Sequence, residues 1–390
     1  MKKTKNKFTA FLERKDIVFS WKRYFIDAMG AMAQGLFASL LIGTIVGTIG
    51  QQLLIYFPLS ADVAAAGLTD AQLLCNINAY DLSFVQVIAL FLNAMGTFAK
   101  GVAGPAMAVS IAYVLKAPNL VLFSMLAVGA AANSLGGAGG PLAVLIIAIV
   151  AAELGKMVSK ETKVDILVTP LVTIGSGALL SFLLAPWIGK AASALGQFIM
   201  WATELQPLLM GILVSVVVGI ALTLPISSAA ICAALSLTGL AGGAAVAGCC
   251  AQMVGFAVMS FKENKFGGLV SQGIGTSMLQ MGNIVKNPKI WIAPILTSAI
   301  TGPLATCLFK LQMNGAAVSS GMGTCGFVGQ IGVYTGWLND ISAGTKTAIT
   351  AFDWIGLILI SFVLPAVLTF IFGQIERKLG WIKEGDLKLN

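Results

Sequence analysis

Long apolar runs separated by short polar segments make up most of the chain. A helix needs about 20 residues to cross a hydrocarbon core. By that measure we predict spans at 28–57, 82–98, 120–134, 141–154, 166–186, 208–224, 229–261, 290–309 and 354–372. Three other segments, 102–115, 266–284 and 318–334, are too polar or too broken for plain spans. We predict re-entrant or discontinuous elements there, covered by protein or facing a water-filled cavity.

Composition supports a membrane location. The 390 residues are 57% hydrophobic and 10% charged, whereas a soluble domain carries about 25% charged residues. So few charges cannot coat a water-facing surface. We therefore expect an all-α polytopic membrane protein with about ten transmembrane helices.

The first 23 residues are strongly basic, with eight Lys or Arg against two acidic residues. Phe and Trp side chains such as Phe8, Phe11 and Trp21 are interleaved with these charges. This mixture predicts an amphipathic, interfacial N-terminal helix over 1–27 on an anionic lipid bilayer. Nucleic-acid binding is the alternative for a basic tail, and the aromatic residues argue against it. We expect no cleavable signal peptide, because no A-x-A site follows a short apolar core.

Lys and Arg placement predicts the orientation. Basic clusters lie in the N-terminal tail, at 156–163, 262–265 and 286–289, and in the tail after Arg377. We place these clusters, and both termini, on the cytoplasmic side of the plasma membrane. Two of them flank 266–284, so that segment enters and returns on one side as a hairpin. Glu153 and Lys156 lie at a predicted helix end, where they snorkel or pair in the headgroup region.

Catalytic chemistry has little support. The chain has no His and six Cys without C-x-x-C spacing. A Ser nucleophile would therefore lack a His base, and the usual metal ligand sets are missing. We expect no catalytic residue, no metal and no cofactor.

Polar residues inside apolar runs are the candidates for solute binding, because they are costly in a bilayer. Four clusters combine helix breakers with uncharged hydrogen-bonding groups, at 133–141, 225–228, 271–283 and 319–324. Broken helices expose backbone groups that bind hydroxyls or anions. Close helix packing is the alternative for any single Ser or Gly. The candidate substrate-binding residues are Asn133, Ser227, Ser228, Gln272, Gly275, Thr276, Ser277, Gln280, Asn283 and Thr324.

The segment 273–302, GIGTSMLQMGNIVKNPKIWIAPILTSAITG, resembles the core of IIC membrane subunits of the phosphoenolpyruvate-dependent sugar phosphotransferase system. In that family a Gly-Ile-Thr-Glu signature precedes an Asn-Pro-Lys-type turn and a long apolar helix. The run at 225–258 and the order of elements look like a divergent sugar-transporter branch that includes perfringolysin-regulator-like proteins.

The resemblance implies a glucose-superfamily-like IIC elevator fold with two re-entrant hairpins, working as a homodimer. We then expect a dimerisation domain at 28–192, an interfacial linker helix at 193–206, a transport domain at 207–373 and a cytoplasmic tail at 374–390. Family members bind sugar through a Glu and a His. This chain has Ser277 in the position of that Glu and no His, which argues against phosphorylation.

Three functions remain open. The first is a IIC-type permease for a small polar solute, sugar or anion, that does not phosphorylate it. The second is a membrane-bound sensor that keeps the fold and transports nothing. The third is a phosphotransferase subunit that works with a separate IIB protein.

Overall fold

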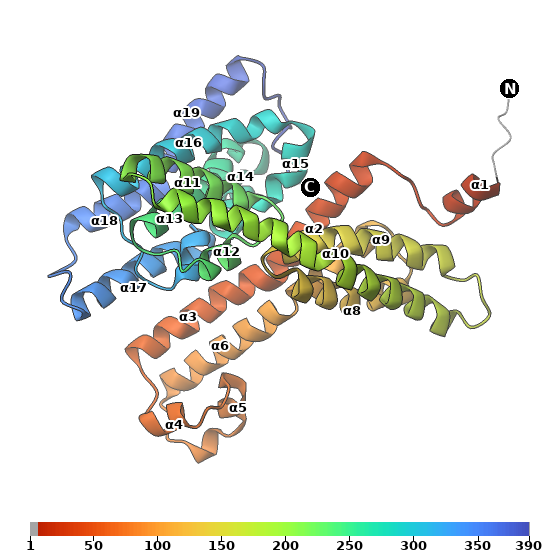
Figure 1. Cartoon of the computed structure of the whole chain (residues 1–390), viewed down its shortest axis with the longest axis horizontal. Helices are drawn as coiled ribbons and strands as arrows, with labels where there is room; N and C mark the ends of the chain where they lie inside the picture. The colour runs from red at the N-terminus through yellow and green to blue at the C-terminus, as the bar shows by residue number, and fades with distance from the viewer. Residues whose placement is uncertain (1–6, 390) are drawn as a thin grey trace.

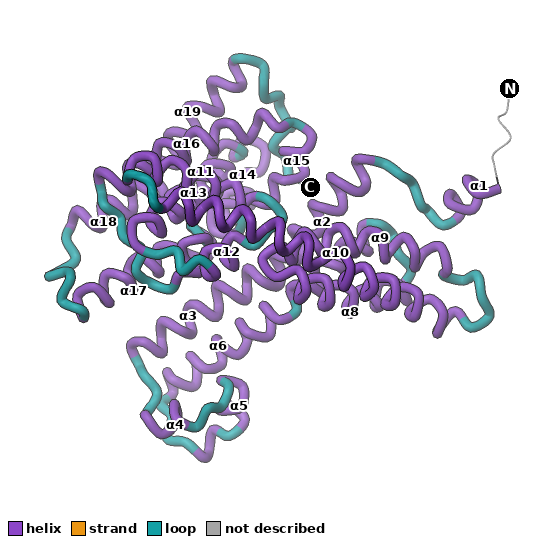
Figure 2. The backbone as a smooth tube through the Cα atoms, in the orientation of Figure 1, coloured by secondary structure: helices purple, strands orange, loops and turns teal. Residues whose placement is uncertain are grey.

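The computed structural model describes residues 7–389, and its regular elements there are helices (Figures 1 and 2). This confirms the predicted all-α class for that range. The predicted N-terminal helix begins outside the described residues; within them α1 covers Lys7–Arg14. The chain then turns at Asp16, with φ +54, and helix resumes at Lys22. The helix predicted over 1–27 is therefore interrupted, and its last turn belongs to the first span.

Seven helical runs in the described residues are long and apolar enough to cross a membrane. They are Lys22–Tyr56, Phe84–Gly101, Asn119–Val158, Asp165–Thr203, Gly239–Met259, Pro288–Leu308 and Ala351–Lys378. Two shorter apolar helices are α7 (Ala103–Val114) and α11 (Pro207–Thr223). A polytopic membrane protein is thus confirmed, while a count of about ten spans stays a prediction.

The first half of the chain packs around α7. Its other helices are the π-helical turns Lys22–Asp27 and Phe37–Leu41, α2 (Ala28–Leu36), α3 (Ile42–Tyr56), α4 (Ala61–Ala65), α5 (Asp70–Cys75), α6 (Phe84–Gly101), α8 (Asn119–Gly136) and α9 (Gly140–Val158). α2, α8 and α9 pack against α7, and α3 lies along α6 (Figure 1). The run 119–158 folds back on itself at Gly137, whose φ of +51 favours glycine.

One helix, α10 (Asp165–Thr203), connects the two halves (Figure 1). It packs against α8 and α9, and also against α11 and α12 (Ser228–Ala234). The separate linker helix predicted at 193–206 is absent, because residues 193–203 are the last turns of α10. Pro186 precedes that segment but does not end the helix, and Pro170 and Pro186 both remain inside it.

The second half is built around α13 (Gly239–Met259). In the most apolar stretch of this helix, 89% of the residues are buried. α11, α16 (Ile292–Pro303) and α19 (Leu364–Lys378) pack against it. Gly248 allows the closest approach, since a Cβ there would lie 1.8 Å from the Ser215 carbonyl oxygen. The remaining helices are α14 (Phe261–Val270), α15 (Met281–Lys286), α17 (Val328–Ser342) and α18 (Ala351–Ile358).

Two predicted elements are divided in the structure. The span expected at 229–261 is split between α12 and α13, because Ser236 and Gly239 take left-handed conformations with φ of +50 and +64. The segment 261–287 breaks at Thr276, whose φ and ψ of −157 and 141 are extended. Both of its ends contact the C-terminal tail, since Asn264 bonds the backbone oxygen of Leu387 and Asn287 bonds that of Trp381.

Charged groups at the end of α9 are buried rather than snorkelling. The Lys156 side chain is 2% exposed, and its Nζ lies 3.1 Å from Glu153 Oε2. The same Nζ donates to the backbone oxygens of Asp16 and Leu115, at 2.8 and 2.9 Å. The pairing agrees with the sequence prediction, and the headgroup location stays a prediction. The segment after α1 covers this site, which the sequence pattern did not indicate.

Candidate functional site

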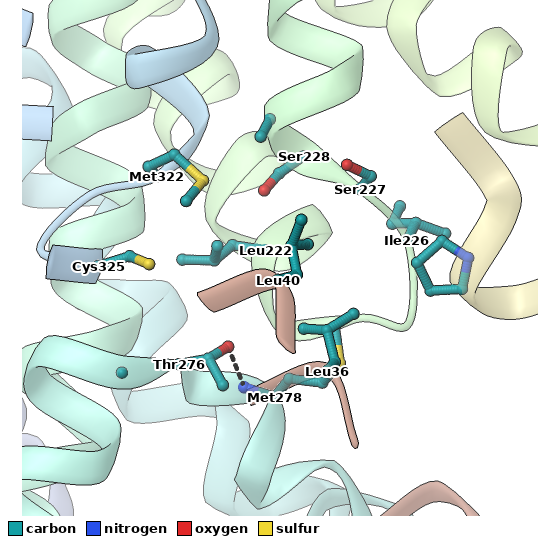
Figure 3. Close-up of a pocket in the computed structure, with 13 residues that line it drawn as sticks. Leu36, Leu40, Leu222, Ile226, Ser227, Ser228, Thr276, Met278, Met322 and Cys325 are labelled. Atoms are coloured by element: carbon teal, nitrogen blue, oxygen red, sulfur yellow. Dashed lines mark hydrogen bonds between the residues drawn. The ribbon is translucent and has the colours of Figure 1, made fainter. Parts of the chain in front are cut away.

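The two halves of the chain face each other across a narrow cavity of about 60 Å³ (Figure 3). One wall is formed by Leu36 and Leu40 of the first helical run together with Pro141 of α9. The other wall contains Leu222, Ile226, Ser227, Ser228, Ala229, Gly275, Thr276, Met278, Met322 and Cys325. Ordinary ligand pockets measure about 300 Å³ or more. The two walls must therefore separate before a drug-sized or sugar-sized solute fits.

The first break in the second wall follows α11. Leu224 is extended, with ψ 159, because Pro225 disfavours helical geometry in the residue before it. α12 then begins with Ser227, whose Oγ accepts a hydrogen bond from the Ala230 N–H at 3.2 Å. A hydroxyl in this N-cap role is common at helix starts. The break therefore places two adjacent hydroxyls, Ser227 and Ser228, at the cavity.

The second break lies at the tip of the 261–287 segment. A π-helical turn, Ser271–Gly275, ends at Thr276, and a short 3₁₀ turn, Ser277–Gln280, follows. Thr276 Oγ1 accepts a hydrogen bond from the Met278 N–H at 3.2 Å (Figure 3). Gly275 and Thr276 thus line the cavity at a point where the helix is interrupted.

The third break lies at 317–327 and is bonded to the other two. Gly323 takes a φ of +54, and a Cβ there would lie 2.6 Å from Cys249 Cβ. The Ser228 hydroxyl donates to the Gly321 carbonyl oxygen at 2.8 Å. The Thr324 hydroxyl donates to the Gly273 carbonyl oxygen. The three breaks are therefore one hydrogen-bonded unit.

A buried polar network lies behind this unit. The Ser277 and Thr223 hydroxyls are 2.8 Å apart, and Thr223 also donates to Gln252 Oε1 at 3.3 Å. Gln252 Oε1 accepts a second hydrogen bond, from Trp291 Nε1 at 2.8 Å. Gln252 Nε2 donates to the Ser298 hydroxyl at 3.4 Å. Because Gln252 is fully buried, these bonds hold α11, α13 and α16 in register with the tip.

A second set of amides links the 261–287 segment to the C-terminal tail. Gln280 Nε2 donates to Gln272 Oε1 at 2.8 Å and to the Leu387 carbonyl oxygen at 3.0 Å. Asn283 Nδ2 donates to Gln280 Oε1 at 2.8 Å and to the Lys388 carbonyl oxygen at 2.9 Å. These side chains are thus occupied by the chain's own backbone.

Comparison with known families decides the family. The family model described as "Phosphotransferase system, EIIC" matches residues 26–389. This chain belongs to the EIIC family. No curated protein and no solved structure matches it. EIIC proteins are the membrane components of sugar transporters, so this EIIC chain is a membrane permease of IIC type.

The EIIC chain brings some predicted residues together and keeps others apart. Ser227, Ser228, Gly275 and Thr276 line the cavity. Ser277 and Thr324 lie directly behind it, bonded to Thr223 and Gly273. Gln272, Gln280 and Asn283 form the amide set at the tail. Asn133 is outside the lining, on α8, where its side chain packs against Gly140 and Gly104.

The sequence analysis missed Thr223, Gln252 and Ser298. A signal existed for one of them, because Gln252 is an amide in the middle of an apolar run. Within residues 7–389, no group of three or more His, Cys, Asp or Glu side chains is placed to hold a metal ion. The EIIC cavity is therefore lined by hydroxyls, backbone groups and apolar side chains.

Proposed function

We propose that this EIIC protein moves a small polar solute, a sugar or sugar-like molecule, across the plasma membrane without phosphorylating it. The observation that carries the proposal is the hydrogen-bonded unit of three helix breaks on one side of the cavity. The other side of the cavity belongs to the first half of the chain. A site divided between two bodies in this way suits a solute that is released when the bodies move apart.

The lining favours a neutral solute over an anion. No Lys, Arg, Asp or Glu is among the lining residues. The hydroxyls of Ser227 and Thr276 accept bonds from backbone N–H groups, and each hydroxyl oxygen has a second lone pair. A sugar offers hydroxyls to these groups and its apolar ring faces to residues such as Leu36 and Met322.

An elevator movement fits the division of the chain. The three breaks, α11, α13, α16 and α19 form one packed body, corresponding to a transport domain at 207–373. The residues 28–192 would be the scaffold and would carry the homodimer contact. If this transport body slid along α2, Thr276 and Ser228 would move past the cavity wall that the first half of the chain forms.

Transport without phosphorylation is supported by the residues near the tip. The chain has no His, and Ser277 stands where the resemblance places the family's Glu. The Ser277 hydroxyl is fully buried and bonded to Thr223. A separate IIB partner would then have no sugar hydroxyl activated for it.

The basic clusters support cytoplasmic termini, because they gather on one side. Arg14 and Lys15 pair with Glu161 at 2.7 and 2.6 Å. Lys262 pairs with Glu384 of the tail at 3.2 Å. A cavity of about 350 Å³ is lined by Lys22 and by Lys286. The clusters predicted to be cytoplasmic are thus contiguous.

Counterflow in proteoliposomes without a phospho-donor tests the proposal. We expect exchange of at least one neutral sugar from a panel that also contains anionic solutes. Ser228→Ala and Thr276→Ala should slow exchange about tenfold, the equivalent of one hydrogen bond of about 1.4 kcal/mol. Ser193→Ala is the matched control, since Ser193 is exposed on α10 and bonds only its own helix at Gly189.

The other outcomes would contradict the proposal in different ways. Ligand-induced thermal stabilisation without flux would identify a sensor. Exchange of anionic solutes alone would identify an anion permease. Phosphoenolpyruvate-dependent modification of the accumulated sugar would identify a phosphotransferase subunit.

A further inference from the structure

We propose that residues 386–389 gate the route between the central cavity and the side of the molecule that carries both tails. The proposal rests on the permease function and assigns a regulatory role to a segment that the function does not use. Three cavities lie between the same two walls of the molecule.

The three cavities are arranged in series. The central cavity is lined by Leu36 and Leu40 on one wall and by Thr276 and Met278 on the other. A second cavity, of about 30 Å³, is lined by Gly30 and Gln34 and by Leu279, Gly282 and Asn283. A third, of about 350 Å³, is lined by Lys22, Asp27, Gly30, Gln34 and Lys286. From the central cavity outwards, residue numbers fall along the first wall, from Leu40 to Lys22, and rise along the second wall, from Thr276 to Lys286.

The second cavity has the smallest volume of the three, and the tail lies there. Lys388 and Leu389 complete its lining. Leu387 is fully buried. At 30 Å³ the passage admits no more than a water or two, so this conformation is closed on the side of the tails. Movement of Lys388 and Leu389 would join the central cavity to the wide outer one.

The tail is held by neutral side-chain amides. Asn264 binds it on two sides, with Nδ2 donating to the Leu387 carbonyl oxygen and Oδ1 accepting from the Leu389 N–H, both at 2.8 Å. Gln280 and Asn283 donate to the Leu387 and Lys388 carbonyl oxygens. These hydrogen bonds are uncharged and individually weak, and Asn287 Nδ2 adds one bond to the Asp386 carboxylate at 2.9 Å. A short non-helical segment held by them suits reversible release.

Release of the tail would also be sensed at the solute-binding tip. Gln280 and Asn283 are bonded to each other, and Gln280 is bonded to Gln272. Gln272 in turn lies in the π-helical turn that ends at Thr276. Opening of the route and rearrangement of the tip are therefore coupled through one chain of amides.

Thiol accessibility tests the gate without any transported solute. Met278→Cys, on the wall of the central cavity, serves as the reporter, with the exposed Cys75 and Cys307 and the cavity-lining Cys325 replaced by Ser. Purified protein in nanodiscs is treated with a water-soluble maleimide. We expect deletion of 386–390 and the substitution Asn264→Ala each to raise the labelling rate of Cys at 278 about tenfold. Asn339→Ala is the control, because Asn339 makes a similar bond to the Asn314 backbone remote from the tail.

Unchanged labelling in both tail variants, or an equal rise in Asn339→Ala, would overturn the gate. Where the deletion does not yield monodisperse protein, Asn264→Ala decides alone. The hydrogen-exchange rate of the Leu389 amide, expected to rise in Asn264→Ala, verifies that the tail has been released. Faster labelling with no counterflow would retain the gate and remove the permease. Counterflow with unchanged labelling would retain the permease and overturn the gate.

Discussion

Gln252 is the side chain on which the buried network behind the cavity depends. Its Oε1 accepts hydrogen bonds from Trp291 Nε1 at 2.8 Å and from Thr223 Oγ1 at 3.3 Å. Gln252→Leu keeps the approximate size of the side chain and removes the one acceptor of both hydrogen bonds. Thr223 keeps other partners, Ser277 and the Gly219 carbonyl, whereas the Trp291 indole N–H loses the hydrogen bond that the structure gives it. The substitution therefore leaves a partly buried donor without a bond.

The size of the effect follows from that orphaned donor. An unsatisfied buried donor costs about 1–3 kcal/mol, and because Trp291 is only partly buried, Gln252→Leu should destabilise by about 1–2 kcal/mol. Trp291→Phe removes the donor and should cost about 1–2 kcal/mol, largely from lost packing. In the double variant neither partner is left unpaired. The two changes should therefore be less than additive by about 1–1.5 kcal/mol.

Unfolding in mixed micelles titrated with SDS, followed by circular dichroism, measures this cycle. Gln330→Leu is the control, because Gln330 is buried in the same half and its Oε1 has no hydrogen-bond partner in the described structure. It should cost little. Additivity within about 0.5 kcal/mol for Gln252 and Trp291, or an equal cost for Gln330→Leu, would refute the network as a stabilising element.

Three further predictions concern packing and charge. Gly248→Ala should destabilise by more than ~2 kcal/mol in the same assay, because a Cβ there would meet the Ser215 carbonyl at 1.8 Å; Gly175→Ala, with open space around it, should be neutral. Lys156→Met should cost about 1.5–3 kcal/mol, since Glu153 loses its nearest cation and keeps only Arg23 Nε at 3.8 Å and the Tyr24 hydroxyl at 2.9 Å, while Lys262→Ala, which breaks a pair with Glu384 that is 70% and 81% exposed, should leave the transition unchanged. The Lys15 hydrogen bond lowers the pKa of Glu161 below 4.5. The attachment of the N-terminal arm is therefore present above that pH and is lost as the pH falls through the lowered value. Hydrogen exchange of the arm's amides at pH 3 and 6, corrected for intrinsic rates, measures this attachment, and equal exchange at the two pH values would contradict the prediction.

Much of the helical framework could be predicted from hydrophobic runs, because a helix in a bilayer must be long and apolar. The run at 354–372 lies within an observed span, and the runs at 82–98 and 290–309 exceed two others by only two residues and one residue. The division of 229–261 was not predicted, because Gly239 is one small residue among many, and its left-handed conformation depends on tertiary packing. The continuity of α10 was missed because Pro186 suggested an end that the membrane environment does not require.

For the candidate site, the sequence identified the breaks and not their arrangement. Clusters containing Ser228, Thr276 and Thr324 are bonded to one another in the structure. Single-chain patterns carry no information about such contacts between distant segments. The hydrogen bonds of Gln280 and Asn283 to the tail could not be predicted for the same reason. A side-chain amide in the sequence is equally suited to bind a solute or a backbone carbonyl.

The continuous helix α10 has a mechanical consequence. Its 39 residues make a rod of about 58 Å, almost twice the thickness of a hydrocarbon core of about 30 Å. Such a rod must lean steeply or project far beyond the lipid. Since it packs on α8 and beside α12, it would act as a lever between the two bodies in the proposed elevator movement. Bending would then concentrate at Pro186, where the backbone hydrogen bond is missing, and at the short turn before α11. The stiffness of those two points would set how fast the two bodies can change places.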